Sequence, residues 1–146
     1  MKISIMQPYF FPYLGYFDLL YNSDLFLVYD TVQYIKQGWI NRNRILHPNK
    51  SGWLYIQAPV SRSSFKVSFE TKIMDVRIFD GKPWKQHIIG QLQHYRQEAP
   101  YYEQVVKLIQ ECFSIPEESI SRLNLKILDL CAQYIGIRFK YQFLSE

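Results

Sequence analysis

The chain has 146 residues, of which 48% are hydrophobic and 21% are charged, and its net charge is +4. These values predict one soluble globular domain. No segment approaches the ~18 consecutive apolar residues of a membrane span, and the apolar run at residues 3–6 is too short for a signal peptide. We therefore expect a cytoplasmic protein with no membrane partner, whose mild positive charge favours anionic ligands.

The first thirty residues predict a strand, a loop, a helix and a second strand. Residues 2–6 form a short apolar run, which predicts a buried strand. Residues 7–12 contain two prolines, which remove backbone donors and prevent a regular element. Apolar residues then recur at helical spacing over 13–21, and 25–29 form a continuous apolar strand. This order predicts a βαβ unit and hence a parallel sheet.

The rest of the chain predicts further strands followed by helices, with breakers between them. The last helix is expected to begin in SIPEE, residues 114–118, with a serine cap and early acidic residues. The predicted elements are short strands around Gly38 and Pro48, a strand over 53–59, one or two strands within 65–79, helices over 84–97, 102–113 and from 114–118 to 135, and a final strand over 138–144. Together they indicate an α/β fold with helices clustered in the C-terminal half.

The stretch QPYFFPYLGYF, residues 7–17, joins the first predicted strand to the first helix. A helix N-terminus at such a junction favours an anion, because its backbone N–H groups are unpaired. The glycine-rich motifs of Rossmann and P-loop proteins are absent. Gly15 falls one turn into the helix, where glycine costs about 1 kcal/mol relative to alanine. We therefore expect a ligand to approach the backbone at Gly15.

The order of strand, Y-x-G-Y and second strand resembles the nucleotidyltransferase-type Rossmann domain. That domain carries H-x-G-H at this point, and its histidines bind the phosphates of ATP. Tyr13, Gly15 and Tyr16 keep the spacing and lack the imidazoles. A tyrosine hydroxyl donates a hydrogen bond but carries no positive charge near neutral pH. The resemblance implies a Rossmann-like parallel sheet and a phosphate site at these three residues.

Longer stretches resemble the WbqC-like protein family. They are MQPYFFPYLGYF (6–17), VYDTVQY (28–34) and GWINRNRI (38–45), with similarity continuing through 84–102. The resemblance covers essentially the whole chain and implies a single domain over residues 1–146 that lacks the C-terminal part of longer members. Members often lie among polysaccharide and O-antigen biosynthesis genes. This implies a transferase or ligase acting on a nucleotide or nucleotide-linked sugar, or alternatively a non-catalytic module that binds one.

The strongest polar cluster comprises Asn41, Arg42, Asn43 and Arg44. In an extended segment the two arginines point one way and the two asparagines the other. An arginine grips phosphate with two parallel hydrogen bonds, so the cluster is a candidate ligand site. The alternative is a solvated polar loop.

The candidate catalytic residues are Gln7, Asp30 and His87. Gln7 and Asp30 follow the first two strands, and ligands of open α/β sheets bind outside the carboxyl ends of strands. Gln33 and Lys36 come next along the chain and are expected to face the same crevice. His87 could transfer a proton because histidine titrates near neutrality. Alternatively, Asp30 only stabilises a turn or caps a helix, and His87 is only a packed or surface residue.

The sequence predicts no metal site and no resident cofactor, with ATP and Mg²⁺ or a nucleotide-sugar as the candidate substrate. The expected partner is a small anionic molecule. An exposed sheet edge would also favour a homodimer, because such edges are usually paired or covered. Single-stranded nucleic acid ranks last, because the positive charge is mild and spread along the chain.

Overall fold

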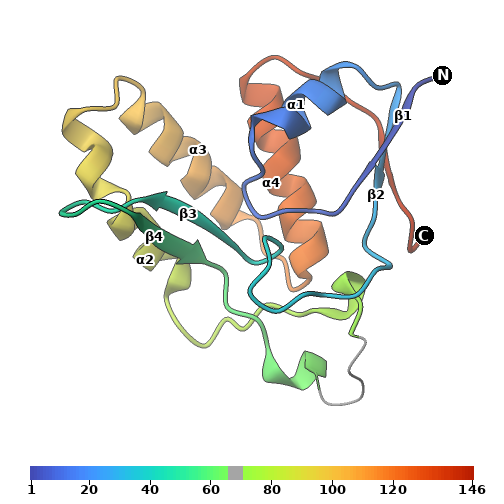
Figure 1. Ribbon diagram of the computed structural model, residues 1–146, viewed down its shortest axis with the longest axis horizontal. Helices are drawn as coiled ribbons and strands as arrows, with labels where there is room; N and C mark the ends of the chain where they lie inside the picture. The colour runs from blue at the N-terminus through green and yellow to red at the C-terminus, as the bar shows by residue number, and fades with distance from the viewer. Residues whose placement is uncertain (66–70) are drawn as a thin grey trace.

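The computed structural model describes residues 1–65 and 71–146, which form a mixed α/β fold (Figure 1). Its strands are β1 (Ile3–Met6), β2 (Leu25–Val28), β3 (Arg42–Leu46), β4 (Trp53–Gln57) and β5 (Tyr141–Phe143), its α-helices are α1 (Leu14–Tyr21), α2 (Trp84–Gln91), α3 (Tyr102–Ser114) and α4 (Ile120–Tyr134), and its 3-10 turns are η1 (Arg62–Phe65), η2 (Ile73–Asp75) and η3 (Gln93–Gln97). Within these described residues no helix is long and apolar enough to cross a membrane.

The predicted βαβ unit is present at the N-terminus. β1 and β2 pair in parallel, with Ile3 opposite Leu25 and Met6 opposite Val28. β5 pairs in parallel with the other edge of β2, which gives the order β1-β2-β5. α2, α3 and α4 all follow residue 83. The α/β class, the parallel sheet and the C-terminal clustering of helices are thus confirmed.

Both helices that cover the parallel sheet lie on the same face of it (Figure 1). Tyr16 of α1 and Leu128 of α4 belong to one apolar cluster with Phe26 and Val28 of β2. The opposite face of β1 carries Ile3 and Ile5, whose side chains are 47% and 51% exposed. The prediction of a buried first strand is therefore wrong for that face. The homodimer through a sheet edge stays a prediction.

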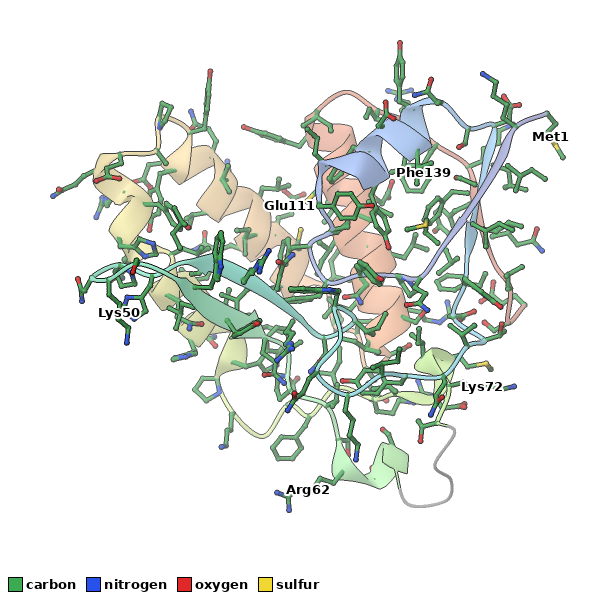
Figure 2. All side chains as sticks on the ribbon, viewed as in Figure 1. Met1, Lys50, Arg62, Lys72, Glu111 and Phe139 are labelled. Atoms are coloured by element: carbon green, nitrogen blue, oxygen red, sulfur yellow. The ribbon has the colours of Figure 1, made fainter. Side chains whose placement is uncertain are left out.

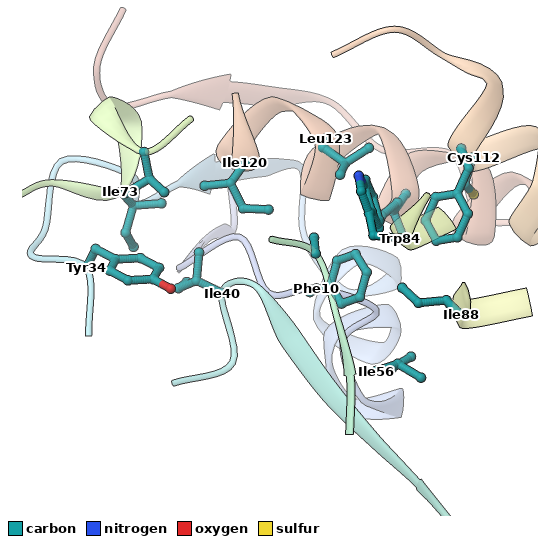
Figure 3. Packing of buried hydrophobic residues seen from close by; sticks show 14 residues of the cluster. Phe10, Tyr34, Ile40, Ile56, Ile73, Trp84, Ile88, Cys112, Ile120 and Leu123 are labelled. Atoms are coloured by element: carbon teal, nitrogen blue, oxygen red, sulfur yellow. The ribbon is translucent and has the colours of Figure 1, made fainter. Parts of the chain in front are cut away.

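A second, larger core lies between the β3–β4 hairpin and the C-terminal helices (Figure 3). Phe10, from the loop after β1, is fully buried in this core and lies near Ile56 of β4 and Trp84 and Ile88 of α2 (Figure 3). Because Phe10 belongs to the QPYFFPYLGYF stretch, the core fixes that stretch against the second half of the chain.

Two helix boundaries differ from the expectations. The helix predicted over 84–97 ends at Gln91 and continues as the 3-10 turn η3, because the backbone N–H of Leu92 bonds to Ile89 and Gly90 rather than four residues back. The last helix begins at Ile120 instead of 114–118. Its cap is Ser119, whose hydroxyl accepts a hydrogen bond from the Arg122 backbone N–H at 3.5 Å.

The strands expected within 65–79 are absent from the described part of that segment. Residues 71–79 contain the turn η2 and isolated bridges, such as Arg77 opposite Ser119 and Val60 opposite Ile78. The Ile78 N–H also donates to the Glu118 carbonyl at 2.7 Å, which holds 117–119 extended and delays the start of α4. Residues 66–70 lie outside the described residues.

Candidate ligand-binding site

A cavity of about 400 Å³ lies where β1 ends and the chain turns into α1. We call it the β1–α1 cavity. Ligands of open α/β sheets bind at the carboxyl ends of strands, so the position is the one expected for a ligand. Its walls come from the loop after β1, from the segment before β3 and from β3 itself. The lining residues are Met6, Tyr9, Pro12, Tyr13, Trp39, Asn43 and Arg44.

The loop that forms one wall is held in a strained conformation by Asn43. Phe11 has φ of 48°, a left-handed value that is rare for bulky residues. The Asn43 amide donates to the carbonyls of both Phe10 and Phe11. The Phe10 N–H in turn donates to the Trp39 carbonyl at 2.9 Å. These bonds join the loop to the opposite wall and keep the cavity open in one shape.

Asn124 of α4 ties both walls of the cavity to the core. Its side chain is only 1% exposed, and its amide donates to the carbonyls of Pro8 and Ile40, each at 2.7 Å. Sequence reasoning missed this residue. The signal that could have identified Asn124 is its place inside the apolar pattern of a helix. A polar side chain buried there needs specific hydrogen-bond partners.

Tyr13 covers Gly15 and forms the outer edge of the aromatic wall. A Cβ atom on Gly15 would lie 2.5 Å from Cε2 of the Tyr13 ring. A side chain at residue 15 would therefore displace the Tyr13 ring from its position against the helix. The approach of a ligand to the Gly15 backbone stays a prediction, and the structure places the Tyr13 ring next to this glycine. The Tyr13 ring itself is 63% exposed and available to a ligand.

Tyr16 belongs to the core instead of lining the cavity. It is fully buried, its ring lies 5.4 Å from that of Tyr9, and its hydroxyl donates to the Gln7 carbonyl at 2.8 Å. Burial, helped by the neighbouring tyrosines, raises the pKa of Tyr16 far above its ordinary value. Of the Y-x-G-Y pair, only Tyr13 reaches the cavity.

We expect Tyr16→Phe to lower the free energy of unfolding by about 1–2 kcal/mol, because the partly buried Gln7 carbonyl loses its donor. Tyr13→Phe is the matched control. Its ring is mostly exposed, so its effect should stay within about 0.5 kcal/mol. Urea unfolding followed by circular dichroism measures both. Equal losses would contradict the assignment of Tyr16 to the core.

Arg44 places a positive charge on the wall of the cavity. Its guanidinium carbon lies 4.5 Å from the ring centre of Trp53 and 5.7 Å from that of Trp39. None of the ion pairs between described residues involves Arg44. Along the sequence, the stretch that contains Arg44, residues 31–69, has six Lys or Arg and no Asp or Glu. The cavity is therefore suited to an anion.

The loop that walls the cavity begins at Gln7, and the model of the WbqC-like protein family matches residues 7–146. The chain belongs to the WbqC-like protein family. It is also 30% identical, over 137 residues, to an uncharacterized protein of Mycobacterium tuberculosis, Rv1507c. The match covers 93% of this chain and 57% of the mycobacterial protein, so the chain spans a little over half of that relative's length. No solved structure matches.

Arg42 in this WbqC-like chain lies outside the cavity lining. Its guanidinium carbon is 4.4 Å from the ring centre of Tyr55, and the group donates to the Gln37 carbonyl. Arg42 is half-buried, whereas Arg44 is exposed. The two arginines share one face of β3, as alternation predicts, and Arg44 is the one that reaches the cavity.

Asn41 is a structural residue. It is 2% exposed; its Oδ1 accepts from the Tyr34 hydroxyl at 2.8 Å, and its Nδ2 donates to the Ala58 carbonyl at 2.9 Å. Burial raises the pKa of Tyr34, and the Arg42 guanidinium opposes this shift. These bonds join the segment before β3 to the end of β4.

The structure does not bring the predicted catalytic residues together in the cavity. Asp30 is 2% exposed and its Oδ2 accepts from the Ser145 hydroxyl at 2.7 Å. His87 is exposed on α2 and lines a different cavity, of about 440 Å³. Gln7 lies next to the lining residue Met6, and its carbonyl receives the Tyr16 bond. Within residues 1–65 and 71–146 no group of His, Cys, Asp and Glu is arranged to hold a metal ion.

The remaining predicted residues, Gln33 and Lys36, also lie outside the lining. Gln33 forms a bridge opposite Lys72, and Lys36 is exposed in the turn before β3. Tyr9 and Trp39 line the cavity and were not among the predicted residues. Their aromatic side chains gave a signal, because the sequence is unusually rich in Tyr and Phe, but composition does not show which rings face a ligand.

Proposed function

We propose that this chain binds a phosphorylated, ring-bearing small molecule, a nucleotide or nucleotide-linked sugar, in the β1–α1 cavity. The observation that carries the proposal is Arg44, whose guanidinium lies near two tryptophan rings and forms no ion pair with a described residue. The rings limit its movement, so little side-chain entropy is lost on binding. Its planar fork matches a phosphate with two parallel hydrogen bonds.

The other walls of the cavity suit a ring. Tyr9, Tyr13 and Trp39 supply aromatic faces, while Met6 and Pro12 supply apolar contacts. A planar base or the C–H face of a sugar stacks on such surfaces. Ligand pockets in proteins have volumes of roughly 300–1,000 Å³, and this cavity, at about 400 Å³, holds one ring and its phosphate.

A second candidate is a transferase or ligase that acts on a nucleotide-linked sugar in surface polysaccharide (O-antigen) biosynthesis in the cytoplasm, with ATP and Mg²⁺ or the nucleotide-sugar as substrate. The observation that favours it is Asp30, which follows β2 beside the end of β1. One oxygen of this buried carboxylate has no hydrogen-bond partner among the described residues. The reaction would depend mainly on positioning and charge neutralisation, because the cavity lining contains no cysteine, serine or histidine.

We expect Arg44→Ala to weaken binding of UDP-glucose or ATP by about 10- to 100-fold, because a charge-assisted pair of hydrogen bonds is lost. Isothermal titration calorimetry measures the dissociation constants. Arg138→Ala is the matched control, since Arg138 is also exposed and lines a different cavity. The control should bind like the unmodified chain.

Two outcomes would decide against the proposals. If Arg44→Ala and Arg138→Ala bind both ligands equally well, Arg44 does not hold a phosphate and the proposed function is wrong. The same samples, incubated with Mg²⁺ and acceptor amines, should release UDP, AMP or pyrophosphate if the chain is a transferase or ligase. Binding without any release would reject the second candidate and retain the first.

A further inference from the structure

One face of the β3–β4 hairpin carries a row of arginine and aromatic side chains. The hairpin lies beside α2, which contacts β4, and Lys50 is near its tip (Figure 2). Its strands pair antiparallel with Arg44 opposite Tyr55, so side chains two residues apart share a face. We call this the Arg–aromatic face. Its residues are Arg42, Arg44, Trp53 and Tyr55.

The Arg–aromatic face has the properties of a stacking surface. Trp53 is 54% exposed and Tyr55 is 45% exposed. Arg44 lies over the Trp53 ring at 4.5 Å and Arg42 over the Tyr55 ring at 4.4 Å, each measured to the ring centre. Positive charge therefore alternates with aromatic surface. No acidic residue of the 31–69 segment neutralises this charge, since that segment has none.

The face is continuous with the β1–α1 cavity. Arg44 lies both on the cavity wall and over Trp53, so it belongs to both surfaces. The cavity volume is near the lower end of the range for ligand sites. A ligand with two rings would therefore extend out of the cavity, and Trp53 is the stacking surface next to Arg44.

We infer that the ligand is a two-ring molecule joined by a diphosphate, with one ring in the β1–α1 cavity, the diphosphate at Arg44 and the second ring stacked on Trp53. Arg42 and Tyr55 continue the Arg–aromatic face next to Arg44 and Trp53. This inference rests on the proposed function and narrows it from any nucleotide to a nucleotide-linked sugar. Single-stranded nucleic acid, which also combines flat rings with phosphates, is the competing partner.

The test compares UDP-glucose with its two halves, UMP and glucose 1-phosphate, by calorimetry. We expect the whole molecule to bind at least 10-fold more tightly than either half, because the second half binds as a tethered group. Trp53→Ala should weaken the binding of UDP-glucose by about 10-fold, since the second ring of the ligand loses its stacking on Trp53. Its effect on binding of the half that occupies the cavity should be smaller, because that half loses only the restraint that Trp53 places on Arg44. Tyr134→Ala, which removes a ring 51% exposed on α4, is the control.

The outcomes separate the two proposals. Suppose that Arg44→Ala loses all binding of UDP-glucose while Trp53→Ala and Tyr134→Ala bind it with equal affinity. This result would overturn the two-ring inference and would still support the proposed function. Unchanged binding in Arg44→Ala would overturn both. The chain could instead bind an oligothymidylate more tightly than UDP-glucose and lose that binding in Trp53→Ala. This result would overturn the two-ring inference and identify single-stranded nucleic acid as the partner.

Discussion

Phe10→Ala is expected to lower the free energy of unfolding by about 3–5 kcal/mol, the cost of removing a fully buried phenylalanine ring. Phe10 is 0% exposed, and its ring packs edge-on against Phe11 at 4.8 Å within the larger core. Domains of this size are stable by about 5–15 kcal/mol. The substitution would therefore remove a large part of the stability, although Phe10 lies in a loop and not in a helix or strand.

Urea unfolding followed by tryptophan fluorescence measures this loss, because Trp84 lies in the same core. Phe79→Ala is the control, since Phe79 is a phenylalanine with 47% of its surface exposed. The control should lose no more than about 1 kcal/mol, in proportion to the smaller buried area. A loss in Phe10→Ala as small as in the control would show that the loop does not contribute to the core.

Asn124→Ala is expected to lower the free energy of unfolding by about 3 kcal/mol, because the carbonyls of Pro8 and Ile40 both lose their buried donor. Asn124→Asp keeps the shape and replaces the donor amide by a carboxyl group. The ionised carboxylate would face two carbonyl oxygens, so its pKa in the folded state should be raised. Stability would then be higher at acidic pH, where the group is protonated, and would fall as the pH rises.

Urea unfolding of Asn124→Asp at pH 4 and pH 7 measures this dependence, with the unmodified chain at both values as the reference. Gln133→Ala is the control on the same helix. Gln133 is exposed, and its side chain donates to Asp129, four residues before it on the same helix. The control should change stability by less than about 0.5 kcal/mol. An Asn124→Ala variant as stable as this control would show that the two bonds contribute little.

The βαβ start could be predicted because its signals are local. Pro8 and Pro12 mark the loop, and the continuous apolar run of β2 is typical of a parallel strand. The exposure of Ile3 could not be predicted, because it depends on α4 packing on the same face of the sheet as α1. The early end of α2 is only weakly signalled, since Gly90 lowers the helix propensity but Leu92 and Gln93 are acceptable helix residues.

Part of the candidate site could also be predicted. Tyr13, Asn43 and Arg44 line the cavity, and all three were chosen for their position in aromatic and polar motifs. The role of Gly15 could not be deduced, because a glycine that admits a ligand and one that admits a neighbouring ring look alike in the sequence. Spacing likewise gave no means to separate Arg42 from Arg44, because their different contacts come from residues elsewhere in the chain.

The bonds of Asn124 also bear on the order in which the chain folds. They span 116 and 84 residues of the chain. Contacts of such separation form late, because the entropy of closing a long loop must be overcome first. The N-terminal loop is synthesised first, yet it gains these two bonds only after α4 docks. The walls of the β1–α1 cavity are therefore expected to reach their final arrangement late in folding.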